Sequence, residues 1–350
     1  MATPQVFIVD EISFPLHLQY RFAGTTAGEG KEKNISLLAD ISRVRPGDPV
    51  IFYQIGHGFY GIFQIAQTHE HPFWERKYGW LQDELRLPKK ERPLIYRVLI
   101  EPLQVYKRPV NEWAAIDRLP LYARDVRWSL FYRKLKGERG CSYMFPHEYE
   151  GLKELIELAN PEGPIAVPGE SGELSWEDGE IRVRRDVPKR AYGGSRASPF
   201  SHINLRGAEI HLQAWFAWHI GKEPDMEPIC GNPVWFANEY FTGSGMQKGD
   251  ILCVLVSGSN REFRLVELKV VESKAEHLEQ FRRYIRWVKD YVWREGDIIQ
   301  PIWVSKGFQE LEEAKKKAKK IADEEGCREL QLYRWELVGN QPSFIPLHLP

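Results

Sequence analysis

The chain has 350 residues and a formal net charge of −1, with 43% hydrophobic and 28% charged residues. This length allows two domains that each bury a core, and the charge excludes a polycation that holds nucleic acid over its whole surface. Contacts with a polyanion must therefore come from local clusters of basic residues. The N-terminus carries acids where a secretion signal needs bases, and no apolar run reaches transmembrane length, so we expect a cytoplasmic protein without membrane contact.

The first half of the chain predicts a mixture of short strands and helices. Strands are predicted at residues 6–9, 50–54, 59–66 and about 94–105, and helices at about 37–44 and 147–159. Several strands with one or two covering helices are typical of a small barrel-like α+β domain.

Two strand sequences in this half form a recognisable pattern. Residues 45–54 read RPGDPVIFYQ and residues 58–66 read GFYGIFQIA, which gives a Gly-Asp turn, a Phe-Tyr strand and a strand that opens with G-x-x-G. The pattern resembles the EVE and wider PUA-like group, which includes the YTH readers. The resemblance implies a β-barrel domain over residues 1–160 that binds nucleic acid and admits a flipped, modified base into an aromatic pocket.

Aromatic and basic residues supply candidates for such a pocket. The strand phenylalanines are assigned to the core, whereas two tryptophans lie among charged residues, where they are better placed to stack on a base. A nearby basic run is interpreted either as a grip on phosphates or as a solvated charged face. An asparagine before the first long helix lies where related domains often contact the base or backbone. These candidates are Trp74, Trp128, Asn34, Arg133, Lys134 and Arg139.

Residues 161–200 are rich in Pro, Gly and Ser and predict the boundary between two domains. The segment has an excess of basic residues, among them Arg184, Arg185, Lys189 and Arg190. We expect a flexible basic strap that neutralises DNA phosphates, and the alternative is an ordinary solvated linker.

The sequence of the second domain, residues 201–350, predicts helices and strands in the order α-β-β-β-α-β-α-β. Helices are predicted at 204–221, from 278 onward and at 309–325, and strands at 251–256, 263–271, 298–305 and 330–338, with one further strand that carries Glu239. Pro301 predicts that its strand lies at an edge or ends there. The four cysteines form no C-x-x-C pair, so we expect them to be reduced. The histidines lack the H-x-x-x-H spacing of a metal site, so we expect them to lie on helix surfaces or in packing contacts. These residues are Cys141, Cys230, Cys253, Cys327, His202, His211 and His219.

Charged residues gather on the predicted hairpin of this domain. Asp250 opens the first strand, and Glu267 and Lys269 lie two residues apart on the second, so their side chains leave the same face. Folding the hairpin brings the two carboxylates and the ammonium together, a costly cluster unless a divalent cation joins it. Gln280 and Tyr284 are four residues apart on the helix that follows.

This ordered set resembles the PD-(D/E)xK nuclease superfamily, in its RecB-like branch with the Gln-x-x-x-Tyr addition. The stretch from Glu239 through Thr242-Gly-Ser-Gly to Asp250 is similar to the NucS-type mismatch endonucleases of that superfamily. The resemblance implies a mixed sheet flanked by helices, in the arrangement of restriction endonucleases.

The same resemblance implies a metal site. Mg²⁺, for which Mn²⁺ substitutes, is expected on Asp250, Glu267 and the carbonyl of Leu268, with Glu239 and Glu209 adding to the shell or holding a second ion. For Glu209 the alternative is an exposed helix glutamate. The catalytic residues implied beside these acids are Lys269, Gln280 and Tyr284.

The sequence thus predicts a Mg²⁺-dependent endonuclease on double-stranded DNA, most plausibly a modification-dependent restriction enzyme whose first domain reads the base. One alternative is a NucS-like endonuclease for mismatched or branched DNA. Another is a non-catalytic nucleic-acid-binding protein on a nuclease scaffold, against which the intact Asp250, Glu267 and Lys269 argue. The sequence leaves open whether the protein forms a homodimer.

Overall fold

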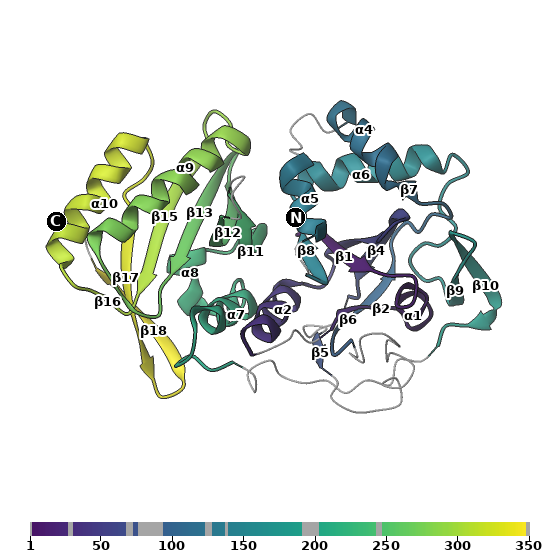
Figure 1. The fold of residues 1–350 in the computed structure, drawn as a ribbon, viewed down its shortest axis with the longest axis horizontal. Helices are drawn as coiled ribbons and strands as arrows, with labels where there is room; N and C mark the ends of the chain where they lie inside the picture. Colours follow the sequence, from purple (N-terminus) through teal and green to yellow (C-terminus); the bar gives the residue numbers. More distant parts are fainter. Residues whose placement is uncertain are drawn as a thin grey trace. The chain divides into compact units, whose positions relative to one another are not determined.

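The chain divides into two compact units, Ala2–Ser201 and His202–Pro350 (Figure 1). The structure, a computed structural model, describes residues 2–26, 31–67, 73–75, 94–122, 128–136, 139–190, 203–242 and 247–347. In these stretches, no helix is both long enough and apolar enough to pass through a membrane. Each unit is described by itself below.

An 8-stranded mixed sheet forms the centre of the first unit, with the order β2-β6-β4-β3-β1-β8, while β5 pairs with β6 and β7 with β4. The order ends at β2 and β8, and no pairing joins these two strands in the described residues. The predicted barrel-like α+β domain is therefore present as a half-barrel sheet with covering helices. Its strands are β1 (Gln5–Val9), β2 (Phe22–Thr25), β3 (Pro49–Gln54), β4 (Gly58–Ile65), β5 (Phe73–Glu75), β6 (Tyr96–Pro102), β7 (Val110–Asn111) and β8 (Cys141–Tyr143).

Helices cover both faces of this sheet. On one face, helices α4, α5 and α6 place Ala115, Phe131 and Leu152 against Ile51 and Phe59 of the strands. On the other face, Phe14 of α1 packs on Phe52, with ring centroids 5.4 Å apart. The helices are α1 (Phe14–Tyr20), α2 (Lys31–Arg43), α4 (Glu112–Tyr122), α5 (Trp128–Lys136) and α6 (Pro146–Ala159).

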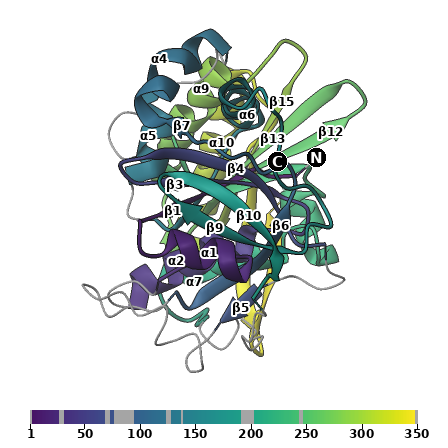
Figure 2. The same cartoon turned by 90° about the vertical axis from the view of Figure 1, so that its right-hand side faces the viewer.

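Most of the expected linker is folded onto the first unit. Strands β9 (Gly172–Glu177) and β10 (Glu180–Pro188) form a hairpin that lies next to α1 in Figure 2. The guanidinium of Arg21 donates to the carbonyl of Gly172 at 2.7 Å, and the hydroxyl of Tyr60 donates to that of Gly179 at 2.8 Å. The boundary prediction therefore placed the end of the first unit too early. The reason is that only Leu174 and Ile181 mark the buried side of a Gly- and Glu-rich hairpin. Residues 191–200 lie outside the described residues.

Two of the predicted phosphate contacts in this unit are buried ion pairs. The ammonium of Lys134 is 1% exposed and pairs with Glu148, whose carboxylate also accepts the backbone N–H of Phe145 at 2.7 Å. Arg139 makes two hydrogen bonds to the buried carboxylate of Asp40. The expectation of a phosphate-gripping face is therefore wrong for Lys134 and Arg139. Their acidic partners come from distant elements, which the local basic run does not reveal.

A 6-stranded mixed sheet with the order β11-β12-β13-β15-β17-β18 forms the centre of the second unit. The pairs β13–β15 and β15–β17 are parallel, and the other three are antiparallel. Its strands are β11 (Trp235–Phe241), β12 (Lys248–Ser257), β13 (Asn260–Leu268), β15 (Ile298–Ser305), β17 (Gln331–Val338) and β18 (Gln341–Leu347), and a separate pair is β14 (Glu272–Ser273) with β16 (Gly307–Phe308).

Helices lie on both faces of this sheet as well (Figure 1). Phe216 and Ile229, from α7 and α8, pack against Ile251 and Val266 on one face. On the other, Phe281 of α9 packs on Trp303, with ring centroids 5.4 Å apart. The helices are α7 (Glu209–His219), η2 (Pro224–Met226), α8 (Glu227–Cys230), η3 (Ala275–Glu279), α9 (Gln280–Tyr291) and α10 (Leu311–Glu325).

The predicted order of elements in this unit is present, with the short elements η2, α8, β14, η3 and β16 inserted and β18 added at its end. The helix expected at 204–221 is shorter, because it begins at Glu209. The edge position expected from Pro301 is wrong: its strand, β15, lies between β13 and β17. Proline lacks only the N–H, and its carbonyl still accepts a bond from the side chain of Gln300 at 3.2 Å.

We expect the buried pair Lys134–Glu148 to matter for the stability of the first unit. Glu148→Gln leaves a buried ammonium without its counter-charge and should lower the free energy of unfolding by about 3–5 kcal/mol. Glu162→Gln, which breaks the exposed Arg108–Glu162 pair, is the matched control and should cost at most about 1 kcal/mol. Denaturant titrations measure both values, and equal losses would contradict the prediction.

Candidate active site

The β12–β13 hairpin brings the predicted acids together. The register pairs Ile251 with Val266, and one step further it places Asp250 beside Glu267 on the same face. The turn is shorter than predicted, with Gly258 in the left-handed region at φ 64°. Strand β13 ends at Leu268, so Lys269 follows it directly, at the edge of the sheet where the site lies.

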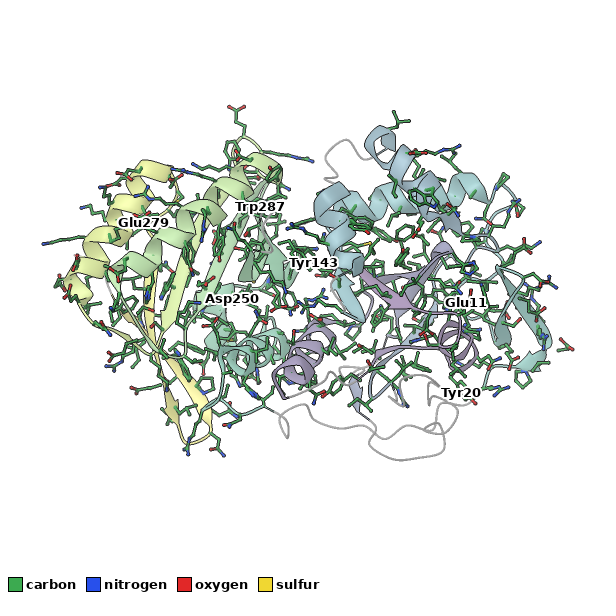
Figure 3. All side chains as sticks on the ribbon, viewed as in Figure 1. Glu11, Tyr20, Tyr143, Asp250, Glu279 and Trp287 are labelled. Carbon is green, nitrogen blue, oxygen red and sulfur yellow. The ribbon has the colours of Figure 1, made fainter. Side chains whose placement is uncertain are left out.

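Asp250 is held by hydrogen bonds from the two elements beside it. The backbone N–H of Leu268 donates to Oδ2 at 2.8 Å. Gln213, a buried residue of α7, reaches Oδ1 and the carbonyl of Asp250 at 3.4 Å each. Figure 3 labels Asp250 near this helix. Gln213 was not predicted, and only its position four residues after Glu209 on the same helix could have suggested it.

Glu267 is buried, with 5% of its surface exposed, and its two oxygens have different surroundings. Oε1 accepts hydrogen bonds from Lys269 Nζ at 2.8 Å and from Gln280 Nε2 at 2.5 Å. Oε2 has no hydrogen-bond donor in the described part of the chain, and the same is true of Gln213 Oε1. Buried oxygens without a donor are costly, and a further positive group would offset that cost.

Lys269 is the cation that joins the acids. Its Nζ lies 2.8 Å from Glu267 Oε1, 3.3 Å from both carboxylate oxygens of Glu209 and 2.9 Å from the carbonyl of Leu268. Burial by itself would lower the pKa of Lys269, but the charges of Glu267, Asp250 and Glu209 raise it above the ordinary value. The ammonium therefore stays charged.

The acids of the cluster hold their protons unusually tightly. Burial, together with the negative charge of Glu209, raises the pKa of Asp250 to about 7 against the opposing effect of Lys269. Burial and the charge of Asp250 raise the pKa of Glu267 to about 8. Burial also raises the pKa of Glu209. One lysine does not compensate these carboxylates, which is the electrostatic condition that favours a bound divalent cation.

The other predicted site residues divide into two groups. Glu209 begins α7 and reaches the cluster through Lys269. Glu239 lies across from Asp250 in the β11–β12 register, but its backbone has φ 47° and its carboxylate pairs with Lys248 Nζ at 3.2 Å. The structure therefore brings Glu209 to Lys269, whereas the contact found for Glu239 is Lys248.

Aromatic residues hold the backbone around the cluster. The hydroxyl of Tyr284 donates to the carbonyl of Lys248 at 2.9 Å, two residues before Asp250. The indole of Trp335 donates to the carbonyl of Lys269 at 2.9 Å. Tyr284 was predicted at this site, but Trp335 was not, because it lies on a strand distant in the sequence and forms no motif with the acids.

The donor atoms fit a hard divalent cation. No three His, Cys, Asp or Glu side chains of the described ranges meet closely enough to hold a metal ion by themselves. A metal site here needs the carboxylates of Asp250 and Glu267 together with the backbone carbonyl oxygen of Leu268. Lys269 Nζ donates hydrogen bonds both to that carbonyl and to Glu267. Carboxylate and carbonyl oxygens are the ligands that Mg²⁺ and Mn²⁺ prefer. The donorless Glu267 Oε2 agrees with this interpretation.

The described histidines of the second unit contact the backbone or aromatic rings. His219 is buried, stacks on Trp215 at 4.0 Å and bonds its carbonyl. His211 Nδ1 accepts the backbone N–H of Asn204. His202 lies outside the described residues. The four cysteines are free thiols.

The predicted nucleic-acid contacts of the first unit are not brought together in the described residues. The side chains of Trp74 and Trp128 lie outside the described part. Asn34 accepts a hydrogen bond from Tyr96 at 2.7 Å, and Arg133 is half-buried. The basic residues of the expected strap lie on β10 or directly after it. Three of them form ion pairs with glutamates, and Lys189 is exposed. These pairs are Arg184–Glu177, Arg185–Glu170 and Arg190–Glu173.

Two other buried polar side chains of the first unit have unused hydrogen-bonding atoms. The amide nitrogen and oxygen of Gln54 have no partner among the described residues, and neither does His17 Nε2. Gln54 lies two residues from Phe52 on β3, so both side chains leave the same face, and the ring of His17 lies 5.5 Å from Phe52. Burial lowers the pKa of His17 to about 4. The sequence pattern did not single out either residue.

No protein-family model matches the chain, and no curated protein sequence matches it. Solved structures that resemble it include a protein from Rhodopseudomonas palustris, at 15% identity and a TM-score of 0.27, covering 45% of this chain and 94% of that one. They also include the human THYN1 protein in complex with DNA that contains 5-methylcytosine, at 12% identity and a TM-score of 0.30, covering 45% of this chain and 98% of that one.

The MspJI restriction endonuclease in complex with a 27-mer oligonucleotide resembles the chain at 13% identity and a TM-score of 0.17. This match covers 87% of the present chain and 60% of the MspJI chain. At identities and TM-scores this low, neither ligand nor activity transfers from these proteins.

Proposed function

We propose that the second unit is a metal-dependent nuclease that hydrolyses phosphodiester bonds in DNA. The observation that carries the proposal is the cluster of Asp250, Glu267 and Lys269 on one sheet face, in which a buried carboxylate oxygen has no donor. In the buried Lys134–Glu148 pair of the first unit, by contrast, neither carboxylate oxygen of Glu148 is among the buried atoms of the described residues that lack a hydrogen-bond partner. Such a cluster stabilises a fold poorly and serves a charged ligand well.

Asp250, Glu267 and the carbonyl of Leu268 would hold Mg²⁺ or Mn²⁺. A metal ion bound there polarises a phosphate oxygen and lowers the pKa of its bound water, which supplies hydroxide at neutral pH. Glu209 is a further candidate through its contact with Lys269. Glu239 remains a more distant candidate, since its carboxylate is engaged by Lys248.

The chain's own residues orient these groups. The N–H of Leu268 fixes Asp250, and Gln280 fixes Glu267 through Oε1, which leaves Oε2 available to a ligand. Lys269 keeps its proton and can donate to an attacking water or to a phosphate oxygen as charge develops there. Tyr284 holds the backbone just before Asp250.

We further propose that the first unit selects the DNA by reading a flipped, modified base. The unpartnered amide of Gln54 and Nε2 of His17, beside Phe52 and Phe14, support this proposal. A primary amide offers both hydrogen-bond donors and an acceptor to a base edge. The full assignment is then a modification-dependent restriction endonuclease that acts in the cytoplasm.

Two alternative functions can be distinguished from this proposal by experiment. A NucS-like endonuclease would cut mismatched or branched duplexes and ignore base modification. A non-catalytic DNA-binding protein would bind without cutting. Cleavage of modified, unmodified, mismatched and branched duplexes in parallel separates these functions, because each predicts a different substrate as the one that is cut.

We expect Lys269→Ala to abolish cleavage while leaving DNA binding and the fold in place. The lysine donates to the reacting groups, and the loss of one such group lowers the rate by roughly 10²–10³-fold. Glu267→Gln should act in the same way by weakening the metal site. Glu276→Gln, an exposed acid on η3, is the control and should cut normally. EDTA should stop the wild-type protein, and wild-type rates for Lys269→Ala would contradict the mechanism.

We expect metal-free protein to lose stability as the pH rises from about 5 to 8. The folded pKa values of about 7 for Asp250 and about 8 for Glu267 lie above the ordinary values of 3.8 and 4.5, so the folded state keeps protons that the unfolded state has released. The free energy of unfolding then falls by up to about 1.4 kcal/mol per pH unit for each group.

The comparison for this measurement is the double variant Asp250→Asn, Glu267→Gln, which removes both titrations. His17 acts in the opposite direction between its lowered pKa of about 4 and the ordinary 6.5, so the difference between the two proteins is the quantity to follow. Mg²⁺ should restore stability at high pH in the wild type alone. A difference that does not change with pH would contradict the assigned pKa values.

We expect Gln54→Leu to remove the preference for modified DNA without weakening the fold. Leucine fills the space of the amide, and no partner of Gln54 among the described residues loses a bond. Loss of a base-edge contact should reduce discrimination by about 1–3 kcal/mol. The measurement is a titration of full-length Lys269→Ala against matched modified and plain duplexes.

The control for this titration is Gln309→Leu, a change on the second unit that should leave the preference intact. Trp74→Ala and Trp128→Ala test the two tryptophans predicted from sequence. Equal affinity of the parent protein for all duplexes would remove the reader proposal and leave the nuclease proposal standing.

A further inference from the structure

Most basic residues of the second unit are paired with carboxylates. Arg261 pairs with Asp297, for example, and Arg282 with Glu279. Some basic residues, however, have no carboxylate at ion-pair distance in the ranges that the structure describes. Among them are Arg206, Arg283, Arg294, Lys306, Lys316 and Lys319. Two of them lie near the candidate active site: Arg283 on α9, and Lys306 directly after β15.

Lys306 is tied to the site through Trp335. Its Nζ lies 3.9 Å from the centroid of the Trp335 ring, and the indole N–H of the same ring donates to the carbonyl of Lys269. Strands β13 and β15 are parallel, with Leu268 beside Val304, so Lys269 and Lys306 follow the carboxyl ends of adjacent strands. Carboxyl ends of parallel strands are where such sheets bind ligands.

Arg283 lies on the helix that supplies Gln280. The two residues are three positions apart on α9 and therefore neighbours on its surface, and Arg283 is exposed. Its charge acts to lower the pKa of the adjacent Tyr284, against the larger effects of burial and of the acids. An exposed guanidinium without a carboxylate stands ready for an external anion.

The site itself needs such cations. Asp250, Glu267, Glu209 and Lys269 are engaged with one another or would hold the proposed cation, so they offer no partner to the neighbouring phosphates. Each phosphate beside the one being cleaved also needs a partner if the DNA is to be held.

We propose that Lys306 and Arg283 form a cationic rim that binds DNA phosphates flanking the scissile one. The inference rests on the proposed nuclease function, since it takes the nucleic-acid backbone as the ligand. The rim supplies affinity and position without reading sequence. Neither residue belongs to the motifs that pointed to the catalytic cluster.

The test compares rim variants with matched controls in the full-length protein, in Ca²⁺ so that binding is measured without cleavage. The rim variants are Lys306→Gln and Arg283→Gln. Lys222→Gln is the control for the lysine, because Lys222 also lies on an indole, 3.7 Å from Trp218, but beyond the far end of α7. Arg294→Gln is the control for the arginine, since it follows the far end of α9.

The readout is the dissociation constant of an unmodified duplex over a series of salt concentrations. Each rim variant should bind roughly 10-fold more weakly and lower the slope of log K against log salt by about 1, while both controls match the wild type. Lys306→Arg keeps the charge and should keep the slope. A change in thermal stability alone would not move the slope, so a packing role for Lys306 is separated from phosphate binding.

Two failures can be told apart. If the wild type binds duplex and both rim variants match it in affinity and slope, the rim is wrong and the nuclease proposal stands. If the wild type binds no duplex at low salt, the proposed function fails and the rim with it.

Discussion

The acidic cluster of the second unit depends on one ammonium group placed among several carboxylates. Lys269 contacts Glu267 from its own hairpin and Glu209 from the start of α7, and its backbone is held by Trp335 from β17. Without this cation the buried acids would repel one another, and each would hold its proton more tightly still. The carboxylates remain only partly compensated, with pKa values of about 7 and 8 for Asp250 and Glu267. That imbalance is the electrostatic condition on which the proposed metal site rests.

The protein contains an internal contrast that shows what distinguishes such a site. In the first unit, Lys134 and Glu148 form a buried pair in which the same carboxylate oxygen accepts both the ammonium and a backbone N–H, at the start of α6. In the second unit, Glu267 Oε2 lies buried without a donor in the described chain. Both carboxylates cost free energy to bury, but only the second leaves that cost unrecovered. An unrecovered cost of this kind is retained when a ligand makes use of it.

The two proposed activities divide the physical work. The second unit supplies charge and oxygen donors, which act on any phosphodiester and carry no information about sequence. Selectivity must therefore come from elsewhere, and the first unit offers a buried amide and a neutral imidazole beside aromatic rings. Joining a reader to a nonselective nuclease on one chain raises the local concentration of the cutting site near the chosen base.

The sequence by itself determined the elements that carry the second unit and the members of its cluster. The alternation in β12 and β13, the two-residue spacing of Glu267 and Lys269 and the helical spacing of Gln280 and Tyr284 are local, and local periodicity fixes which side chains share a face. Tertiary structure alone decided the partners that come from distant segments: Gln213 beside Asp250, Trp335 beneath Lys269, Glu239 drawn to Lys248, and Lys134 and Arg139 buried against acids far along the chain. It also folded part of the expected linker, residues 172–188, into a hairpin of the first unit. The physical reason is that spacing constrains only neighbours on one element, whereas burial, charge pairing and unmet hydrogen bonds depend on which elements pack together.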